Sequence, residues 1–190
     1  PRLGTAGDDV MLGTEFDDNL QGLAGADQLD GKGGSDWLGG DAGNDTLGGG
    51  FGDDTLIGGD GDDQFLQSSW ATGGNDSLDG GAGNDRFGDS LGRNVLDGGA
   101  GDDHFTVFIA DDAGANVVSG GAGQDTYEIL PRTASFSSLA YLILDFEVGI
   151  GGDLLDVREL VAASARERYF VAGSSSSAEF LRLLPSGSDA

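Results

Sequence analysis

An apolar residue recurs at a fixed spacing over about two-thirds of the chain. These residues are nine apart, except for two steps of thirteen, and they are Met11, Leu20, Leu29, Leu38, Leu47, Leu56, Phe65, Leu78, Phe87, Leu96, Phe105, Val118 and Tyr127. Each stands two positions after an anchor residue, aspartate or asparagine, and a glycine precedes the anchor by two positions in every repeat except the one with Phe16. Thirteen repeats therefore run from Gly4 to Glu128, and such repetition predicts a stack of similar units.

Each repeat predicts a short strand and a turn. The three residues after the anchor are too few for a helix, but they suffice for a strand whose middle side chain points to one side. The glycines allow the positive φ values that such a turn requires. Two repeats make one coil of eighteen residues, so strands of alternate repeats stack in parallel and two sheets face each other across the apolar row. One repeat buries only one apolar side chain, so the repeats must stack, as in any solenoid.

Charge adds a second constraint. The 190 residues include 34 acidic and 9 basic ones, for a formal charge of −25, together with 37 glycines. This composition alone is typical of disorder, but a disordered tract has no reason to keep the register of the repeats. The charge disfavours nucleic acid and anionic lipid as partners and favours cations. No apolar run is long enough to span a membrane, and the absence of cysteine excludes disulfides and thiolate metal sites.

The anchors line the turns, in one row along each edge of the predicted roll. Neighbouring coils lie about 4.8 Å apart, so carboxylates in one row repel each other unless a cation lies between them. Calcium accepts carboxylate and carbonyl oxygens in a flexible shell of about six to eight ligands, whereas magnesium requires a stricter octahedron. The pattern therefore predicts calcium between successive turns.

Several repeats share a more specific signature. The segments GGFGDDTLI, GGDGDDQFL, GGAGNDRFG, GGAGDDHFT and GGAGQDTYE match the pattern G-G-x-G-x-D-x-U-x, so the chain resembles the RTX calcium-binding nonapeptide-repeat family. The resemblance implies an all-β fold, a right-handed parallel β-roll, with calcium between the turns of repeats i and i+2. With the anchor counted as position 6, each ion would take the carbonyls at positions 2 and 4 and the anchor of one turn, and the carbonyls at positions 1 and 3 and the anchor of the next.

One such site would join Asp41, Gly43 and Asp45 to Gly58, Asp60 and Asp63, with the Asp60 side chain in solvent. Over the whole chain the resemblance implies metal-ligating residues at Thr5, Gly7, Asp9, Asp18, Gly22, Ala24, Asp27, Gly31, Gly33, Asp36, Gly40, Asp41, Ala42, Gly43, Asp45, Gly49, Gly50, Phe51, Gly52, Asp54, Gly58, Gly59, Asp60, Gly61, Asp63, Asp76, Gly80, Gly81, Ala82, Gly83, Asp85, Gly98, Gly99, Ala100, Gly101, Asp103, Gly120, Ala122 and Asp125.

Alternate repeats fall on two edges, which differ in sequence. The odd edge has aspartate at every anchor and glycine at the start of every repeat, and its anchors are Asp9, Asp27, Asp45, Asp63, Asp85, Asp103 and Asp125. The even edge has the anchors Asp18, Asp36, Asp54, Asp76, Asn94 and Asn116, and its last three repeats start with Ala71, Asp89 and Asp111. We expect about six calcium sites along the odd edge and about three on the even edge that stop beyond Asp76, hence about nine ions in total.

The two steps of thirteen are insertions, at 67–70 and 107–110, and both lead into even turns. The favoured interpretation is that they lengthen a strand or bulge a turn. In the alternative, Trp70, Phe108 and Ile109 form an exposed apolar patch for a partner.

Composition shifts after the repeats, so we divide the chain into a β-roll at 1–128 and a C-terminal cap at 129–190 made of short strands and a short helix. An open roll end exposes apolar side chains and strand edges and therefore needs a cap. The segments LILDF and GGDLLDV resemble the region that follows the repeats in type I secreted proteins. Asp145, Asp153 and Asp156 are interpreted as solvated acids of turns rather than as a further calcium site. Both ends look cut, which indicates a piece of a longer parent polypeptide.

No constellation predicts catalysis. His104 is the single histidine, no G-x-S-x-G segment occurs, and the paired carboxylates are assigned to calcium. Two function classes remain open. One is a module that folds on calcium binding outside the cell, after type I secretion without an N-terminal signal peptide, and stays extracellular or at the cell surface. The other is an interaction module, such as an adhesin segment, a surface-layer subunit or a polysaccharide-binding arm of an enzyme.

Overall fold

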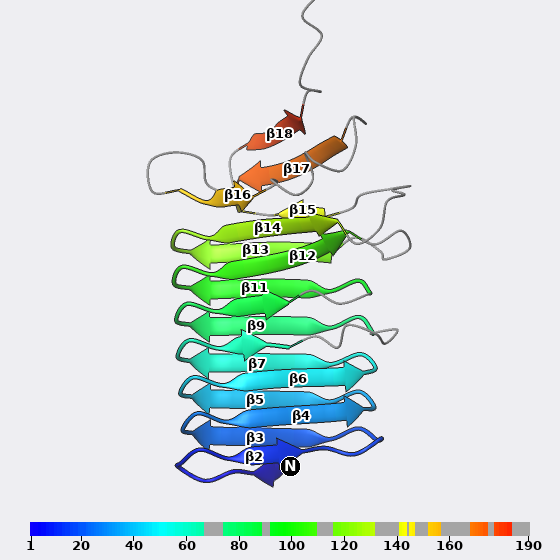
Figure 1. The fold of residues 1–190 in the computed structure, drawn as a ribbon, viewed down its shortest axis with the longest axis vertical. Coiled ribbons are helices and arrows are strands. Elements are labelled where there is room, and N and C mark those ends of the chain that lie inside the picture. Colours follow the sequence, from blue (N-terminus) through cyan, green and yellow to red (C-terminus); the bar gives the residue numbers. More distant parts are fainter. Residues whose placement is uncertain are drawn as a thin grey trace, which may run out of the picture.

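The computed structural model describes residues 1–66, 74–88, 92–109, 116–131, 141–143, 145–146, 152–156, 168–174 and 177–183. In these residues the chain winds as a solenoid of stacked strands, with turns along two long edges (Figure 1). The predicted all-β parallel roll is confirmed. The predicted short helix after Asp156 falls outside the described residues.

Two sheets face each other across the roll. One contains ten strands: β1 (Arg2–Leu3), β3 (Asn19–Ala24), β5 (Trp37–Ala42), β7 (Thr55–Asp60), β9 (Ser77–Ala82), β11 (Val95–Ala100), β13 (Asn116–Ala122), β15 (Tyr141–Ile143), β17 (Arg168–Ser174) and β18 (Ser177–Leu183). The other contains eight: β2 (Val10–Leu12), β4 (Gln28–Gly33), β6 (Thr46–Phe51), β8 (Gln64–Phe65), β10 (Arg86–Gly88), β12 (His104–Ile109), β14 (Thr126–Pro131) and β16 (Leu154–Asp156). Neighbours pair in parallel, except that β17 and β18 form an antiparallel pair.

Equivalent positions of successive coils stack directly on one another. Leu38 pairs with Leu56, and Leu56 pairs with Leu78 although the second step crosses an insertion. The described parts of β15 and β16 continue this register beyond residue 128, because Val118 pairs with Ile143 and Tyr127 with Leu155. Each repeat position therefore forms a column along the roll.

The core is a pair of apolar columns between the sheets. All thirteen predicted apolar residues are buried, and Ile143 extends their row. Phe65, Phe87, Phe105 and Tyr127 form a stack with ring centroids 4.6, 4.7 and 5.2 Å apart. Phe146, from beyond the repeats, packs on Tyr127 with its ring tilted by 54°. Stacked aromatic side chains contribute both buried area and a preferred ring geometry.

The strands are longer than the three residues predicted from the sequence. Seven strands, β3 to β7, β9 and β11, span six residues, because the ladder continues from positions 7–9 of one repeat through positions 1–3 of the next. The chain turns at positions 4–6. The residue at position 2 has a positive φ in most repeats, even where it is not glycine, as at Leu23, Lys32 and Asp41. The sequence predicted shorter strands because the glycine-rich segments were all assigned to turns.

The second insertion lengthens a strand, as favoured. The six residues of β12 pair with the six of β14 as far as Ile109 opposite Pro131. The first insertion, including Trp70, lies outside the described residues. The side chains of Phe108 and Ile109 do so too, and the interpretation as an exposed apolar patch stays an expectation.

The aromatic stack gives a direct test of packing. We expect Phe65→Ala to lower the free energy of unfolding of the calcium-loaded protein by about 3–5 kcal/mol, because it leaves a cavity in the stack. The adjacent Gln64 is exposed, so Gln64→Ala should change it by less than about 0.5 kcal/mol. Urea unfolding followed by circular dichroism measures both, and equal losses would contradict the packing described.

Candidate metal centres along the edges of the roll

Each anchor is held by the next coil on its own edge. The backbone N–H of Asp27 donates to Oδ1 of Asp45 at 2.7 Å, and that of Asp45 donates to Oδ1 of Asp63 at 2.7 Å. The even edge repeats the pattern, with Asp36 N–H to Asp54 Oδ1 at 2.9 Å. From Asp27 and Asp36 onward, this anchor ladder uses one of the two oxygens of each anchor carboxylate.

The second oxygen, Oδ2, is buried and has no hydrogen-bond partner at seven anchors of the described segments: Asp27, Asp36, Asp45, Asp54, Asp63, Asp85 and Asp103. A buried carboxylate oxygen without a partner costs several kcal/mol unless the group is neutralised or paired. A row of such oxygens is the arrangement expected where cations belong, so the chain fits calcium at these positions.

Backbone oxygens converge on the same places. A Cβ built on Gly58, at position 1, would lie within 3.0 Å of both Asp63 Oδ2 and the carbonyl oxygen of Gly80 in the next coil. The same two kinds of oxygen surround Gly22, Gly40 and Gly80. Only glycine leaves this space open, which explains why the odd edge keeps glycine at position 1.

The remaining carbonyls point the way the resemblance implies. A Cβ on Gly59 would meet the Asp41 carbonyl oxygen of the preceding coil, and one on Gly61 would meet that of Gly43. Carbonyls at positions 2 and 4 therefore face the following turn. The position-3 carbonyl of Asp60 already accepts the Gly43 N–H at 2.7 Å, but a carbonyl oxygen has a second lone pair for a further contact.

The arrangement has few side-chain ligands per place. Within the described part of the chain, no three His, Cys, Asp or Glu side chains gather as in a metal site built from side chains alone. Each candidate centre instead joins two anchor carboxylates to backbone carbonyls. Calcium accepts carbonyl oxygens readily, so the absence of such clusters is compatible with this ion.

Burial makes these carboxylates resist ionisation. It raises the pKa of Asp54, Asp63 and Asp103 to about 7 and that of Asp85 and Asp125 to about 6. Hydrogen bonds from the backbone of the preceding anchor oppose the shift, and neighbouring carboxylates add to it. Without cations, the folded roll is therefore under electrostatic stress near neutral pH.

The first turn on each edge is different. Thr5 donates its N–H and its hydroxyl to Asp9 Oδ2, at 2.6 and 2.9 Å, and Thr14 does the same for Asp18 at 2.6 and 2.8 Å. These hydrogen bonds lower the pKa of Asp18. The two N-terminal anchors thus have protein partners for Oδ2, and the unpartnered oxygens belong to the inner turns.

At the C-terminal end of the even edge the anchor hydrogen bonds continue, but asparagine replaces the charged aspartate. Asp76 N–H donates to Asn94 Oδ1 at 2.9 Å, and Asn94 N–H donates to Asn116 Oδ1 at 2.7 Å. An amide offers one oxygen and a nitrogen that cannot ligate a cation as a carboxylate oxygen does. The backbone geometry is therefore continuous while the negative charge of the row ends at Asp76.

Two acids beyond the repeats are also part of the roll, and the expectation that they are solvated was wrong. Asp125 N–H donates to Asp153 Oδ1 at 3.0 Å, so Asp153 continues the odd ladder. Asp145 accepts the N–H groups of Gly120 and Gly121 at 3.0 and 2.8 Å. The sequence reading missed Asp153 because it stands 28 residues after Asp125, although VGIGGDLLD keeps a glycine two before and a leucine two after it. The side chain of Asp156 lies outside the described residues.

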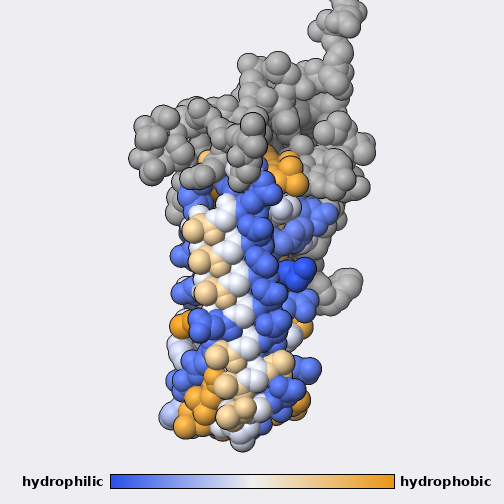
Figure 2. Space-filling model, turned by 90° about the vertical axis from the view of Figure 1, so that its left-hand side faces the viewer, coloured by the Kyte–Doolittle hydropathy of each residue, from blue (hydrophilic) through white to orange (hydrophobic). Residues whose placement is uncertain are grey.

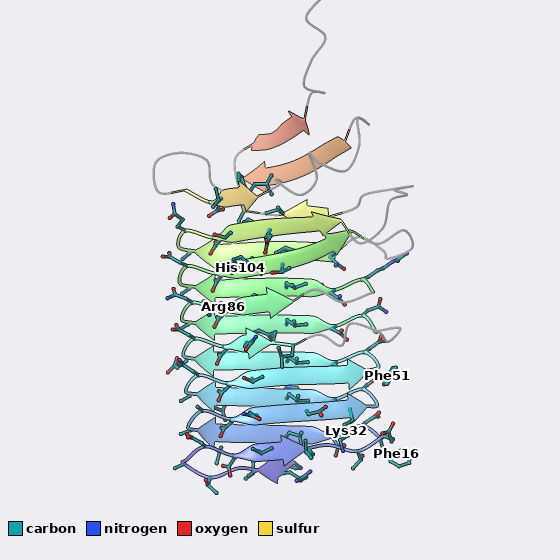
Figure 3. All side chains as sticks on the ribbon, viewed as in Figure 1. Phe16, Lys32, Phe51, Arg86 and His104 are labelled. Atoms are coloured by element: carbon teal, nitrogen blue, oxygen red, sulfur yellow. The ribbon has the colours of Figure 1, made fainter. Side chains whose placement is uncertain are left out.

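The odd edge lies along one side of the roll (Figure 1). Figure 2 shows it face on, with a column of hydrophilic residues running along the roll beside columns of glycine-like neutral and weakly hydrophobic character. His104 directly follows the anchor Asp103 at the start of β12 (Figure 3), and its Nε2 is 3.5 Å from the Glu128 carboxylate. The only histidine of the chain thus lies beside an acidic side chain of β14.

Comparison with known proteins agrees with this geometry. The family model of the RTX calcium-binding nonapeptide repeat matches residues 3–38, 39–66, 70–88, 89–106 and 108–128. The matches cover more than half of the chain, so the protein belongs to the RTX calcium-binding repeat family and contains a calcium-binding β-roll. No curated protein matches the chain. No described helix is long and apolar enough to cross a membrane.

The raised pKa values predict how the metal-free roll responds to acid. A folded state with raised carboxyl pKa values holds protons that the unfolded chain, with aspartate near about 3.9, has released. Its stability is therefore greatest below about pH 4 and is lost as pH rises through about 6 to 7. In metal-depleted buffer, circular dichroism should show more β-structure at about pH 5 than at about pH 7.5. Less β-structure at the lower pH would contradict this electrostatic account, and saturating calcium should remove the difference.

The space at position 1 predicts the effect of a single methyl group. Gly58→Ala needs no positive φ, but its Cβ would clash with Asp63 Oδ2 and the Gly80 carbonyl oxygen. We expect it to raise the calcium concentration at the folding midpoint by about tenfold or more, as when the support of a metal ligand is disturbed. Gly48→Ala is the matched control, because its Cβ would have no neighbour closer than 3.5 Å. Equal midpoints for the two variants would exclude the proposed centre.

Proposed function

We propose that this protein is a secreted calcium-dependent folding module, in which ions between successive coils allow an otherwise self-repelling chain to form the roll. The observation that carries the proposal is the row of buried, unpartnered anchor oxygens. When bound, calcium supplies the positive charge that these carboxylates lack. The protein supplies the anchors, the carbonyls and the glycines that keep room for the ion.

The proposed ligand sets are those of the inner turns. A representative centre uses the carbonyls of Asp41 and Gly43 with Asp45, and the carbonyls of Gly58 and Asp60 with Asp63. The approach of Asp45 Oδ2 and the Gly58 carbonyl oxygen around Gly40 supports this assignment. Extending it along both edges gives about six centres on the odd edge and about three on the even edge, hence about nine ions.

Coupling between binding and folding follows from where the ligands lie. Carbonyls and anchors from two coils meet only after the coils have stacked, so the unfolded chain has no such centre. Binding free energy then becomes folding free energy. Calcium modules of the extracellular space bind at about 10⁻⁴–10⁻³ M, so the chain would stay unfolded at cytosolic calcium, pass out by type I secretion and fold outside the cell. RTX repeats are typical of secreted proteins, which supports this location.

An interaction module for anionic polysaccharide is less well supported. The basic residues of the repeats after Arg2 are Lys32, Arg86 and Arg93. Lys32 in β4 and Arg86 in β10 belong to the same sheet, but β6 and β8 separate them and they lie near opposite edges of the roll (Figure 3), so they do not form one basic cluster.

A calcium titration followed by circular dichroism tests the proposal, with magnesium as the control ion. We expect a coil spectrum at low calcium and a cooperative change to β-structure, with little response to magnesium. Asp63→Asn should raise the calcium midpoint, because it removes a buried anchor oxygen. Asp62→Asn is its matched control, since Asp62 is exposed and uses Oδ1, which asparagine retains, to accept the Asn84 N–H. A fully folded protein in excess chelator would refute the proposal.

A further inference from the structure

Exposed apolar side chains gather on the outer face of the eight-stranded sheet, toward the N-terminal end of the roll. The described segments expose eight large apolar side chains. Five of them lie in β2, in the first even turn, at the end of β6 or directly after β8, and we call these five the apolar face: Val10, Leu12, Phe16, Phe51 and Leu66. Their exposed fractions lie between 48% and 78%. Such a concentration of apolar area on an acidic molecule is typical of a binding surface.

A groove of about 360 Å³ crosses the apolar face over β4 and β6. Val10 and Leu12 bound it on one side and Leu66 on the other. Its floor lies over Gly48 and Gly50 of β6, which have no side chains. A Cβ built on Gly48 would have no neighbour closer than 3.5 Å, so a side chain from outside can reach the floor.

The strand that forms the floor also ends in a projecting ring. β6 passes from Gly48 to Phe51, which is 55% exposed at the even edge (Figure 3). The φ of Gly50, +106°, interrupts the alternation of side chains, so neither residue 50 nor residue 51 is buried. The ring and the empty floor are complementary shapes, but one copy of the chain cannot join them, because both belong to the same strand.

A two-fold axis parallel to the long axis of the roll makes this fit mutual between two copies. With the axis over β4 and β6, the eight-stranded sheets face each other and equivalent strands run in opposite directions. Phe51 of each copy then lies over Gly48 of the other, as an isologous interface requires. By the same operation Asp30 faces Lys32, the single lysine of the chain. One charge of each sign on β4 thus meets its opposite in the second copy.

The area of the apolar face suits a dimer of this kind. Its five side chains expose on the order of 500 Å². A standard interface buries about 800 Å² per partner, of which about 60% is apolar. The formal charge of −25 opposes association, so the form that pairs is the calcium-loaded roll, in which bound ions offset much of this charge.

We propose that the calcium-loaded protein forms a two-fold dimer through the apolar face, in which Phe51 of each copy occupies the groove over Gly48 of the other. The contact is made by outward-facing residues of the sheet and not by the anchors. The two roles are therefore separate, because calcium folds each roll and the apolar face joins two rolls.

Sedimentation equilibrium of the full chain in saturating calcium measures the dimer directly. We expect Phe51→Ser to weaken dimerisation by about tenfold or more, because it removes the ring at the centre of the contact. Gly48→Leu should weaken it as well, since its side chain fills the floor that the ring of the second copy needs. Val95→Ser, at a side chain of β11 that is 50% exposed on the other sheet, is the matched control and should dimerise as the parent does. Tighter association of Gly48→Leu would indicate unspecific apolar attraction and would overturn the proposed fit.

Charge reversal tests the two-fold register. Asp30→Lys and Lys32→Asp each place like charges opposite one another in a homodimer, so each variant alone should dimerise more weakly than the parent. Mixed in equal amounts, the two variants should form a heterodimer, because opposite charges then face each other. Circular dichroism of the same samples checks that every variant folds with calcium. A folded parent that stays monomeric in calcium, or a mixture that associates no better than either variant alone, would overturn the interface.

Discussion

The hydrogen bond from each anchor N–H to the anchor carboxylate of the next coil is the constraint on which the rest of the roll depends. It fixes one oxygen of every carboxylate in the ladder and leaves Oδ2 of the inner anchors buried without a donor. Because the ladder repeats at every coil, a buried carboxylate oxygen without a donor recurs at each inner coil as well. Position 1 must then be glycine wherever Oδ2 and a carbonyl of the next coil approach each other, as at Gly58. The glycine at position 1 and the buried negative charge thus both follow from the anchor hydrogen bond.

The roll's ends resolve this constraint in different ways. Thr5 and Thr14 donate their N–H and hydroxyl groups to Oδ2 of the first anchors, so these two oxygens are not left without a hydrogen-bond donor. At the other end Asp145 and Asp153 add carboxylates instead. The negative charge of the odd edge therefore extends beyond the last repeat, whereas that of the even edge ends at Asp76.

Much of this architecture could be predicted from the sequence, because a period of nine with one apolar residue leaves little choice of packing. The column from Met11 to Tyr127 and the division into two edges follow from spacing alone. The six-residue strands did not, since glycine at position 1 was taken for a turn residue when it pairs in the ladder. Asp153 was missed for a related reason: its contact with Asp125 depends on three-dimensional register and not on distance along the chain.

The steps of thirteen have a consequence for how such a roll tolerates change. Asp54 and Asp63 reach anchors 22 residues on with hydrogen bonds of 3.0 and 2.7 Å, close to those that span 18 residues. Extra residues at 67–70 are thus absorbed without altering the pitch of either ladder. Coils are evenly spaced along the odd edge, whereas added segments are accommodated at the even edge. Foreign peptides grafted into even turns should therefore be displayed at a regular height along one side of the molecule.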